Sequence, residues 1–177
     1  GQDSAAMVNY PAVCRDLTHY EAFAMSALWV YIELAEKVGH KNYMKYLNEL
    51  GYGNGLTEEM PRAFWINGDF KVTPIQQITV LKKIFTGQTS FSPVNIAKLK
   101  QLMLRDERED HKLYGKTGWA QKDRNIGWFV GFVEKNNGEV YYFASRLQTT
   151  GLEHPEDFFY IRKQTTDLYL KVQGIIR

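Results

Sequence analysis

The sequence predicts an α+β fold in which a helical region precedes an antiparallel sheet and a last helix closes the chain. Three observations support this fold class. Apolar residues recur at helical spacing near the N-terminus, three later segments are rich in aromatic and β-branched residues, and an amphipathic segment follows them. No repeat or Pro/Ser-rich linker divides the 177 residues, so we expect a single domain over residues 1–177.

The N-terminal half predicts two helices and a loop. Residues 18–38 carry apolar side chains at helical spacing, and Gly39 follows them, where a helix end favours a residue that tolerates left-handed backbone. We expect one largely buried helix there. A second, shorter helix is predicted over residues 42–50, and the glycine-rich run 51–55 after it predicts a loop.

Two further helices have clear start signals. Thr73-Pro74 and Ser92-Pro93 each place a capping hydroxyl before a proline at the first helical position. These pairs predict helices near residues 75–85 and 94–104.

The hydrophobic period then changes from helical to extended. Residues 112–116, 127–135 and 139–145 predict antiparallel strands, with Asn136-Asn137-Gly138 as the hairpin turn between the last two. A closing amphipathic helix over residues 157–172 would cover one face of this sheet.

Composition is that of an ordinary globular domain, with 44% hydrophobic residues. The formal net charge of +2 favours neither a nucleic-acid partner nor an anionic membrane surface. No stretch approaches the roughly 18 consecutive apolar residues of a membrane helix. The only cysteine, Cys14, cannot support an intrachain disulfide and is predicted to be a small buried apolar residue.

Lys116-Thr117-Gly118-Trp119 lies at the end of a predicted strand and could recognise an acyl substrate that carries a carboxylate. The lysine supplies positive charge, the hydroxyl donates to an anion, and the glycine lets a substrate lie close to the strand edge. The backbone N–H of Trp119 could form half of an oxyanion hole. Taken alone, the segment also fits a charged strand end followed by a turn.

Three other segments have unremarkable interpretations in isolation. Ser26, on an apolar helix, could simply bond to the preceding turn. Tyr52-Gly53-Asn54 could be a plain glycine-rich turn, and Trp65 could be a core residue.

Together and in this order, these segments resemble the penicillin-recognising serine enzymes, specifically the class D β-lactamases. The resemblance runs from about Gly1 to the C-terminus, and the Tyr-Gly-Asn form separates class D from class A. It implies a β-lactamase/transpeptidase-like fold, an antiparallel sheet flanked by helices with a helical subdomain. The segments that carry it are Ala24-Met25, Ser26-x-Leu28, Tyr52-Gly53-Asn54, Phe64-Trp65-Ile66, Thr73-Pro74, Met103-Leu104, Lys116-Thr117-Gly118-Trp119, residues 127–131 and Arg162.

The resemblance implies catalytic roles for Ser26, Lys116 and Trp119. Ser26 would relay a proton towards the leaving nitrogen of a β-lactam, with Lys116 as its positively charged partner. The main-chain N–H of Trp119 would help to stabilise the tetrahedral oxyanion. Thr117 and Arg162 would bind the substrate carboxylate beside Gly118.

Other residues would shape the site. Trp65 resembles the family tryptophan that hydrogen-bonds a carboxylated general-base lysine, so carbon dioxide or bicarbonate is the implied source of that carboxyl group and no metal is expected. Leu28 stands where the family usually has valine, as an apolar lid over that lysine. Tyr52 and Asn54 would form the floor and wall of the cleft, with Gly53 permitting the bend.

The nucleophilic Ser-x-x-Lys of the family does not occur in these 177 residues. Thr79-Val80-Leu81-Lys82 has the spacing, but it lies inside a predicted helix at the wrong place in the family order. Because Gly1-Gln2 resembles residues that come after this motif, we expect the N-terminal strands and the nucleophile helix to lie outside the sequence, in cis or in trans. Without them the chain would expose a sheet edge and an apolar groove, and could form a homodimer.

Three functions remain open from the sequence. The first is a periplasmic or secreted class D serine β-lactamase that confers antibiotic resistance when complete. The second is the β-lactam-sensor domain of a transmembrane receptor, and the aliphatic Leu28 mildly favours the enzyme over this sensor. The third is a catalytically inactive penicillin-binding homologue, which the missing Ser-x-x-Lys favours.

Overall fold

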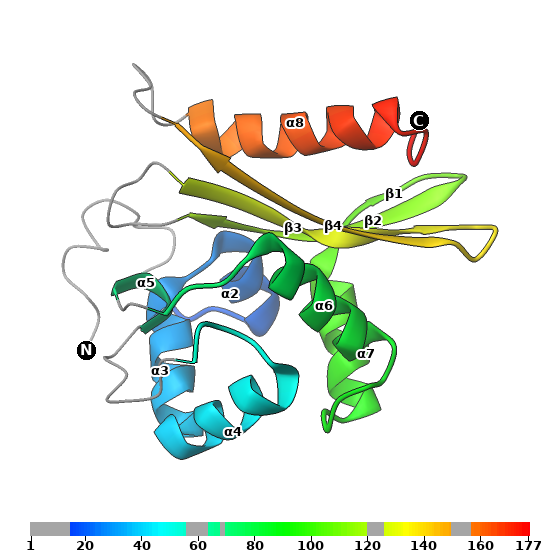
Figure 1. Ribbon diagram of the computed structural model, residues 1–177. Helices are drawn as coiled ribbons and strands as arrows, with labels where there is room; N and C mark the ends of the chain where they lie inside the picture. The colour runs from blue at the N-terminus through cyan, green and yellow to red at the C-terminus, as the bar shows by residue number, and fades with distance from the viewer. Residues whose placement is uncertain (1–14, 56–63, 68–69, 120–125, 150–156) are drawn as a thin grey trace.

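A computed structural model describes residues 15–55, 64–67, 70–119, 126–149 and 157–177, and Cys14 lies outside these ranges. A four-stranded antiparallel sheet lies between helix α8 on one face and the remaining helices on the other (Figure 1). The predicted α+β fold is therefore confirmed. No helix among the described residues is both long and apolar enough to cross a membrane.

The first predicted helix is two helices. Helix α2 spans His19–Met25 and helix α3 spans Leu28–Val38. Ser26 separates them with left-handed backbone angles, φ 53° and ψ 47°. The expectation of one largely buried helix over residues 18–38 is thus wrong on both counts, because the chain turns at Ser26 and α3 has no buried residue.

The next helix follows the predicted glycine signal closely. Helix α4 spans His40–Leu50 and ends at Gly51, whose φ of 65° is left-handed as predicted for a helix C-terminus. Helix α5, Phe64–Asn67, is a short turn that carries Trp65.

Both capping predictions are confirmed. Helix α6 spans Pro74–Phe85, and the Thr73 hydroxyl accepts a hydrogen bond from the backbone N–H of Gln76. Helix α7 spans Pro93–Met103, and the Ser92 hydroxyl accepts from the backbone N–H of Asn95.

The sheet has the order β1-β2-β3-β4. Strands β2 (His111–Trp119) and β3 (Ile126–Lys135) contain the first two predicted strands and extend beyond them. Strand β4 (Val140–Gln148) begins one residue after the third predicted strand and ends three residues beyond it. Strand β1, Leu104–Glu107, was not expected. The closing helix, α8, spans Phe158–Val172 and so agrees with the prediction.

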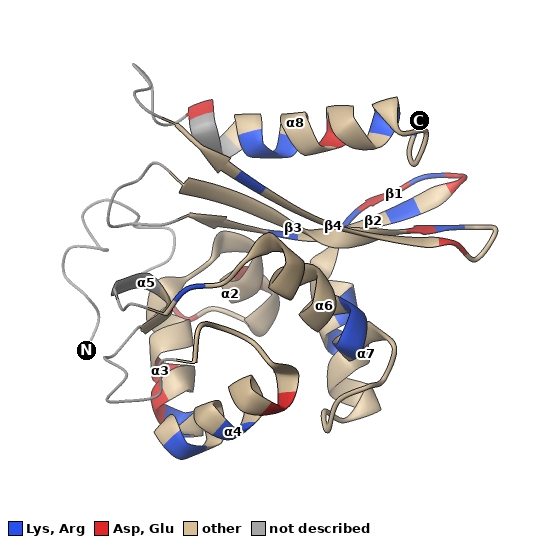
Figure 2. Cartoon of the chain, in the orientation of Figure 1, with Lys and Arg blue, Asp and Glu red and all other residues tan. Residues whose placement is uncertain are grey.

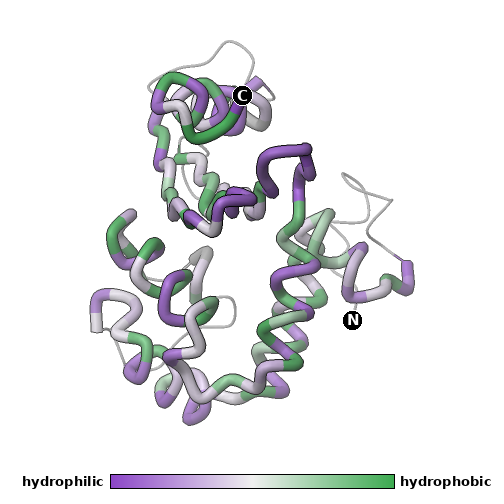
Figure 3. Tube along the Cα trace, turned by 90° about the vertical axis from the view of Figure 1, so that its right-hand side faces the viewer, coloured by the Kyte–Doolittle hydropathy of each residue, from purple (hydrophilic) through white to green (hydrophobic). Residues whose placement is uncertain are grey.

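Alternating residues of the strands build two cores. Leu113, Phe129, Val133 and Phe143 pack with Leu170 of α8 on one face. On the other face, Tyr114 and Phe132 pack with Leu81 of α6 and Met103 of α7. Charged residues gather near the hairpin ends of the sheet and recur along several helices (Figure 2), and apolar and hydrophilic residues interleave along most helices (Figure 3).

A pair of glycines lets β2 and β3 approach each other under the strand end that carries Lys116. Gly115 and Gly131 are directly opposite in the register. A Cβ at Gly131 would overlap the Tyr114 carbonyl oxygen and lie 2.8 Å from the Gly115 Cα, while one at Gly115 would lie 2.5 Å from the Phe129 ring. Backbone cannot give way as a flexible side chain can, so glycine is required at position 131.

We expect Gly131→Ala to lower the free energy of unfolding by about 3 kcal/mol, because the new methyl group overpacks against backbone. Urea denaturation followed by circular dichroism measures this change. Gly118→Ala is the matched control, since its Cβ would meet Trp128 at an ordinary 3.5 Å. Equal stability of the two variants would contradict the close approach of β2 and β3.

Candidate active site

The end of strand β2 carries Lys116, Thr117, Gly118 and Trp119, all within the strand. Gly118 is opposite Trp128 of β3, and Trp119, the last residue of β2, is opposite Gly127. Extension of β2 to Trp119 holds all four residues in the regular ladder with β3, and the turn expected after them falls outside the described residues.

Ser26 and Lys116 come together from positions 90 residues apart in the chain. The Lys116 Nζ donates a hydrogen bond to the Ser26 Oγ, and a second to the backbone carbonyl of Thr117 at 3.0 Å. Ser26 is the only non-glycine residue with positive φ among those described. Left-handed backbone costs a residue such as serine about 1–2 kcal/mol, and such strain concentrates at functional sites.

The ammonium of Lys116 lies in an unfavourable environment for positive charge. Burial, reinforced by repulsion from Arg105 and Arg162, lowers its pKa from 10.5 to about 8. The Nζ also lies 5.6 Å from the centre of the Phe23 ring. A lysine with a pKa this close to neutral exchanges protons readily at physiological pH.

Arg162 reaches the same strand end from helix α8, on the opposite side of the sheet from α2. Its side chain is buried, with 5% of the residue exposed, and its Nη1 donates to the Gly118 carbonyl at 2.5 Å. Burial lowers the pKa of this guanidinium. Arg162 therefore brings positive charge to Gly118 and fixes the edge along which a substrate would lie.

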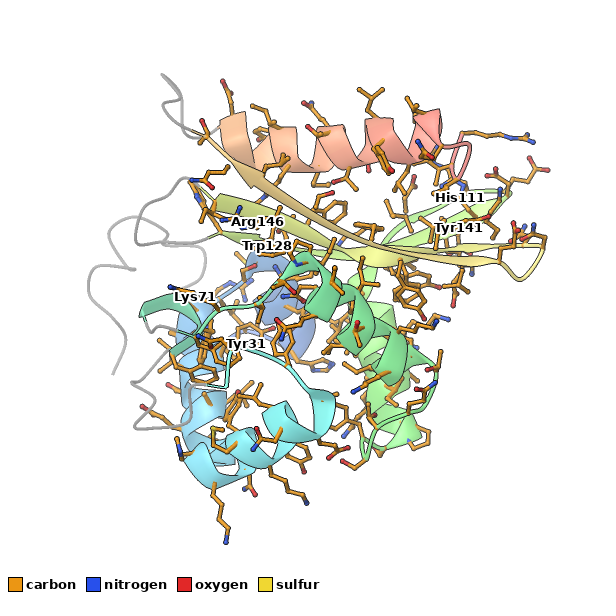
Figure 4. The ribbon with its side chains drawn as sticks, in the orientation of Figure 1. Tyr31, Lys71, His111, Trp128, Tyr141 and Arg146 are labelled. Carbon is orange, nitrogen blue, oxygen red and sulfur yellow. The ribbon has the colours of Figure 1, made fainter. Side chains whose placement is uncertain are left out.

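A cavity of about 490 Å³ opens beside this strand end. Most of its wall is aromatic, with Trp128 of β3 and Tyr31 of α3 both on it; Figure 4 labels these two residues. The cavity brings together six of the residues singled out from the sequence, Tyr52, Trp65, Lys116, Thr117, Gly118 and Trp119. Trp65 is half-buried on this wall rather than in the core, and its indole N–H is of the right type to donate to a lysine-bound carboxylate.

The loop after α4 is fastened to helix α6. The Tyr52 hydroxyl accepts from the Gln77 Nε2 at 2.5 Å, and the Gly53 carbonyl accepts from the Gln76 Nε2 at 2.8 Å. A Cβ at Gly53, whose φ is 99°, would overlap the Phe70 ring. These contacts direct Tyr52 into the cavity wall.

Five of the site residues singled out from the sequence are not among those that line the cavity: Ser26, Leu28, Gly53, Asn54 and Arg162. Asn54 instead accepts a hydrogen bond from the backbone N–H of Lys71 at 3.1 Å. Leu28 is half-buried at the start of α3.

Phe23 and Arg105 contact or influence Lys116 but were not identified from the sequence. No sequence signal marked Arg105, because the charged strand β1 was itself missed. Groups of three or more metal-ligating side chains are absent from the part of the chain that the structure describes.

Comparison with known proteins places this chain in a family. The model of the penicillin binding protein transpeptidase domain matches residues 4–159. The chain is 32% identical over 137 residues to a probable β-lactamase, YbxI, of Bacillus subtilis, covering 77% of this chain and 51% of that protein. It is 28% identical to β-lactamase OXA-10 of Pseudomonas aeruginosa, covering 92% of this chain and 60% of the relative.

A regulatory protein, BlaR1 of Bacillus licheniformis, is 28% identical over 136 residues, which make up 76% of this chain and 22% of that protein. The chain thus spans about half to three fifths of the length of the two β-lactamases and a smaller share of BlaR1.

Solved structures agree with the sequence matches. A class D β-lactamase from Nostoc superposes with a TM-score of 0.85 at 34% identity, covering 94% of this chain and 69% of that one. Another from Sebaldella termitidis gives a TM-score of 0.87 at 32% identity, covering 95% of this chain and 68% of that one. The predicted resemblance is confirmed: this chain belongs to the penicillin-binding protein transpeptidase family, and its homologues there are class D β-lactamases.

Proposed function

We propose that the protein binds β-lactams and, when complete, hydrolyses them through a serine acyl-enzyme. The observation that carries this proposal is the hydrogen bond to Ser26 from Lys116, which also lines the aromatic cavity. A hydroxyl held against a lysine of near-neutral pKa can pass a proton to a leaving nitrogen.

Each residue around this hydrogen bond has a role in the proposal. Lys116 supplies a proton to Ser26, and Ser26 delivers it to the nitrogen of the opening ring. Thr117 and Arg162 bind the substrate carboxylate, and the backbone N–H of Trp119 donates to the oxyanion. The aromatic wall excludes water from the apolar part of the substrate.

The nucleophile belongs to a Ser-x-x-Lys segment outside these 177 residues. We propose that this segment seats its lysine near Trp65, which would donate a hydrogen bond to the carboxyl group that carbon dioxide adds to that lysine. Family membership also favours a periplasmic or secreted protein, because β-lactams reach their targets outside the cytoplasm.

A second candidate is a β-lactam sensor, which is acylated but does not turn over. The match to the regulatory protein BlaR1 favours it specifically. A third, an inactive penicillin-binding homologue, would keep the cavity without reaction.

One experiment separates the three functions. The full gene product is mixed with a chromogenic cephalosporin, with and without bicarbonate, and both colour and protein mass are followed. Continuous colour with turnover is expected for the enzyme, a stable adduct without turnover indicates a sensor, and neither signal indicates an inactive homologue. Bicarbonate is included because loss of a lysine carbamate would imitate inactivity.

Ser26→Ala should lower kcat by at least about 100-fold, because it removes the hydroxyl that transfers the proton. Ser90→Ala is the matched control: the Ser90 hydroxyl donates to Glu49 and lies outside the cavity wall. Steady-state kinetics of both variants test the role. Comparable loss in the two variants, or none in Ser26→Ala, would exclude the proton relay.

The pH dependence of kcat should report the ionisation of Lys116. Because its pKa is lowered to about 8, the ammonium loses its proton as the pH rises through this value, and kcat should fall on the alkaline side with an apparent pKa of about 8. Lys116→Arg keeps a positive charge throughout this range, so its lower activity should stay flat from pH 7 to about 10. An alkaline limb unchanged in Lys116→Arg would assign the titration to another group.

The outer edge of the sheet favours association of the 177-residue chain. Among the described strands β4 pairs with β3 alone, and Leu168, Tyr169 and Val172 of α8 are each more than 60% exposed. An open edge beside apolar surface promotes pairing between copies. Sedimentation should therefore show dimers or larger species that increase with concentration, whereas a cooperative monomer would refute this expectation.

A further inference from the structure

Arg105 lies next to Lys116 although it belongs to a different strand. The register of β1 against β2 shifts between Leu104 and Asp106, so Arg105 sits at an irregularity of the ladder. Such bulges redirect a side chain. Here the Arg105 Nε donates to the carbonyl of Gly115, the residue before Lys116, at 2.8 Å.

The Phe23 ring is shared by two cations. The Arg105 guanidinium lies 5.9 Å from its centre, and the Lys116 Nζ lies 5.6 Å from it. The two positive charges are therefore no more than about 12 Å apart, within the range at which charges in a protein interact. Phe23 belongs to α2, the helix that ends at Ser26.

Arg105 has no carboxylate partner within 4 Å among the described residues. Its neighbour Arg108, by contrast, pairs with Asp106 at 2.7 Å. The residue is exposed as a whole, although partial burial of its guanidinium lowers the pKa of Arg105. Arg105 is therefore held by the Gly115 carbonyl and the Phe23 ring, whereas Arg108 is held by a carboxylate.

The groups that face Lys116 come from several elements. Arg105 approaches from β1, Arg162 from α8, and the Ser26 hydroxyl from the junction of α2 and α3. The cavity wall adds the phenols of Tyr31, Tyr43 and Tyr52, which are neutral at physiological pH. The charges that act on Lys116 are both positive.

We propose that Arg105 and Phe23 form a clamp that holds Lys116 against Ser26, with Arg105 as a positioning residue that does not touch the substrate. The clamp fixes the β2 backbone through the Gly115 carbonyl and confines the lysine side chain between the ring and the serine. This role rests on the proposed function, because it serves proton transfer at Ser26, but the clamp itself is measurable without catalysis.

The direct measurement is the titration of Lys116 in the full chain, by NMR of ¹³C-labelled lysine side chains assigned with Lys116→Arg. In Arg105→Gln the pKa of Lys116 should rise by about half a unit to one unit, because a repelling charge is removed. Arg105→Lys keeps the charge and should leave the titration nearly unchanged. Arg108→Gln, which removes an exposed charge outside the site, is the matched control and should not shift it.

Phe23→Leu should shift the pKa of Lys116 in the opposite direction. Loss of the ring face removes an attraction for the ammonium, so the pKa of Lys116 should fall by about a few tenths of a unit. This variant also decides the question if Arg105→Gln does not fold. A merely structural role would alter stability in both variants and leave the Lys116 titration where it is, and that result would overturn the clamp.

Kinetics supply the second readout. The alkaline limb of kcat should move upward in Arg105→Gln in step with the NMR titration, while KM changes less than kcat. If the wild-type protein shows neither turnover nor an adduct, the proposed function fails while the NMR titration still tests the clamp. If hydrolysis is present and the Lys116 titration is the same in Arg105→Gln and wild type, the clamp fails alone.

Discussion

The hydrogen bond from Lys116 to Ser26 is the interaction on which the candidate site depends. It joins the helical region to the sheet across 90 residues of sequence, and it requires a precise backbone on both sides. On one side, the chain must turn through left-handed angles at Ser26. On the other, the paired glycines Gly115 and Gly131 let β2 and β3 close under the lysine. The site therefore exists only where the helical region and the sheet meet.

The two faces of the sheet pack against different helices, and each set of helices positions a different part of the site. Leu113, Phe129 and Val133 bind α8 to one face, which places Arg162 over the end of β2. Tyr114 and Phe132 pack on the other face against α6 and α7. Because α6 also anchors the loop that carries Tyr52, the same helix supports both the core and the cavity wall.

Local signals in the sequence predicted local structure well. The caps at Thr73 and Ser92 and the hairpin turn depend on neighbouring residues, and their positions were correct. The break at Ser26 could not be predicted from periodicity, because the apolar pattern continues through it and tertiary contact selects the left-handed serine. Strand β1 was missed because its four residues are mostly charged and pair through an irregular ladder. Arg105 was missed with it.

Some site residues can therefore be identified from sequence motifs, and others only from the three-dimensional structure. Lys116 and Trp65 could be identified from residue order, whereas Phe23 and Arg105 become visible only through their distances to Lys116. Residues of both groups determine the electrostatic environment of Lys116. Arg105 and Arg162 oppose the charge on Lys116, so an anion that binds near them would relieve this repulsion and raise the pKa of Lys116. By linkage, protonation of Lys116 must strengthen anion binding to the same degree. In the proposed reaction, a substrate carboxylate would thus help to keep the proton on Lys116, which would deliver it.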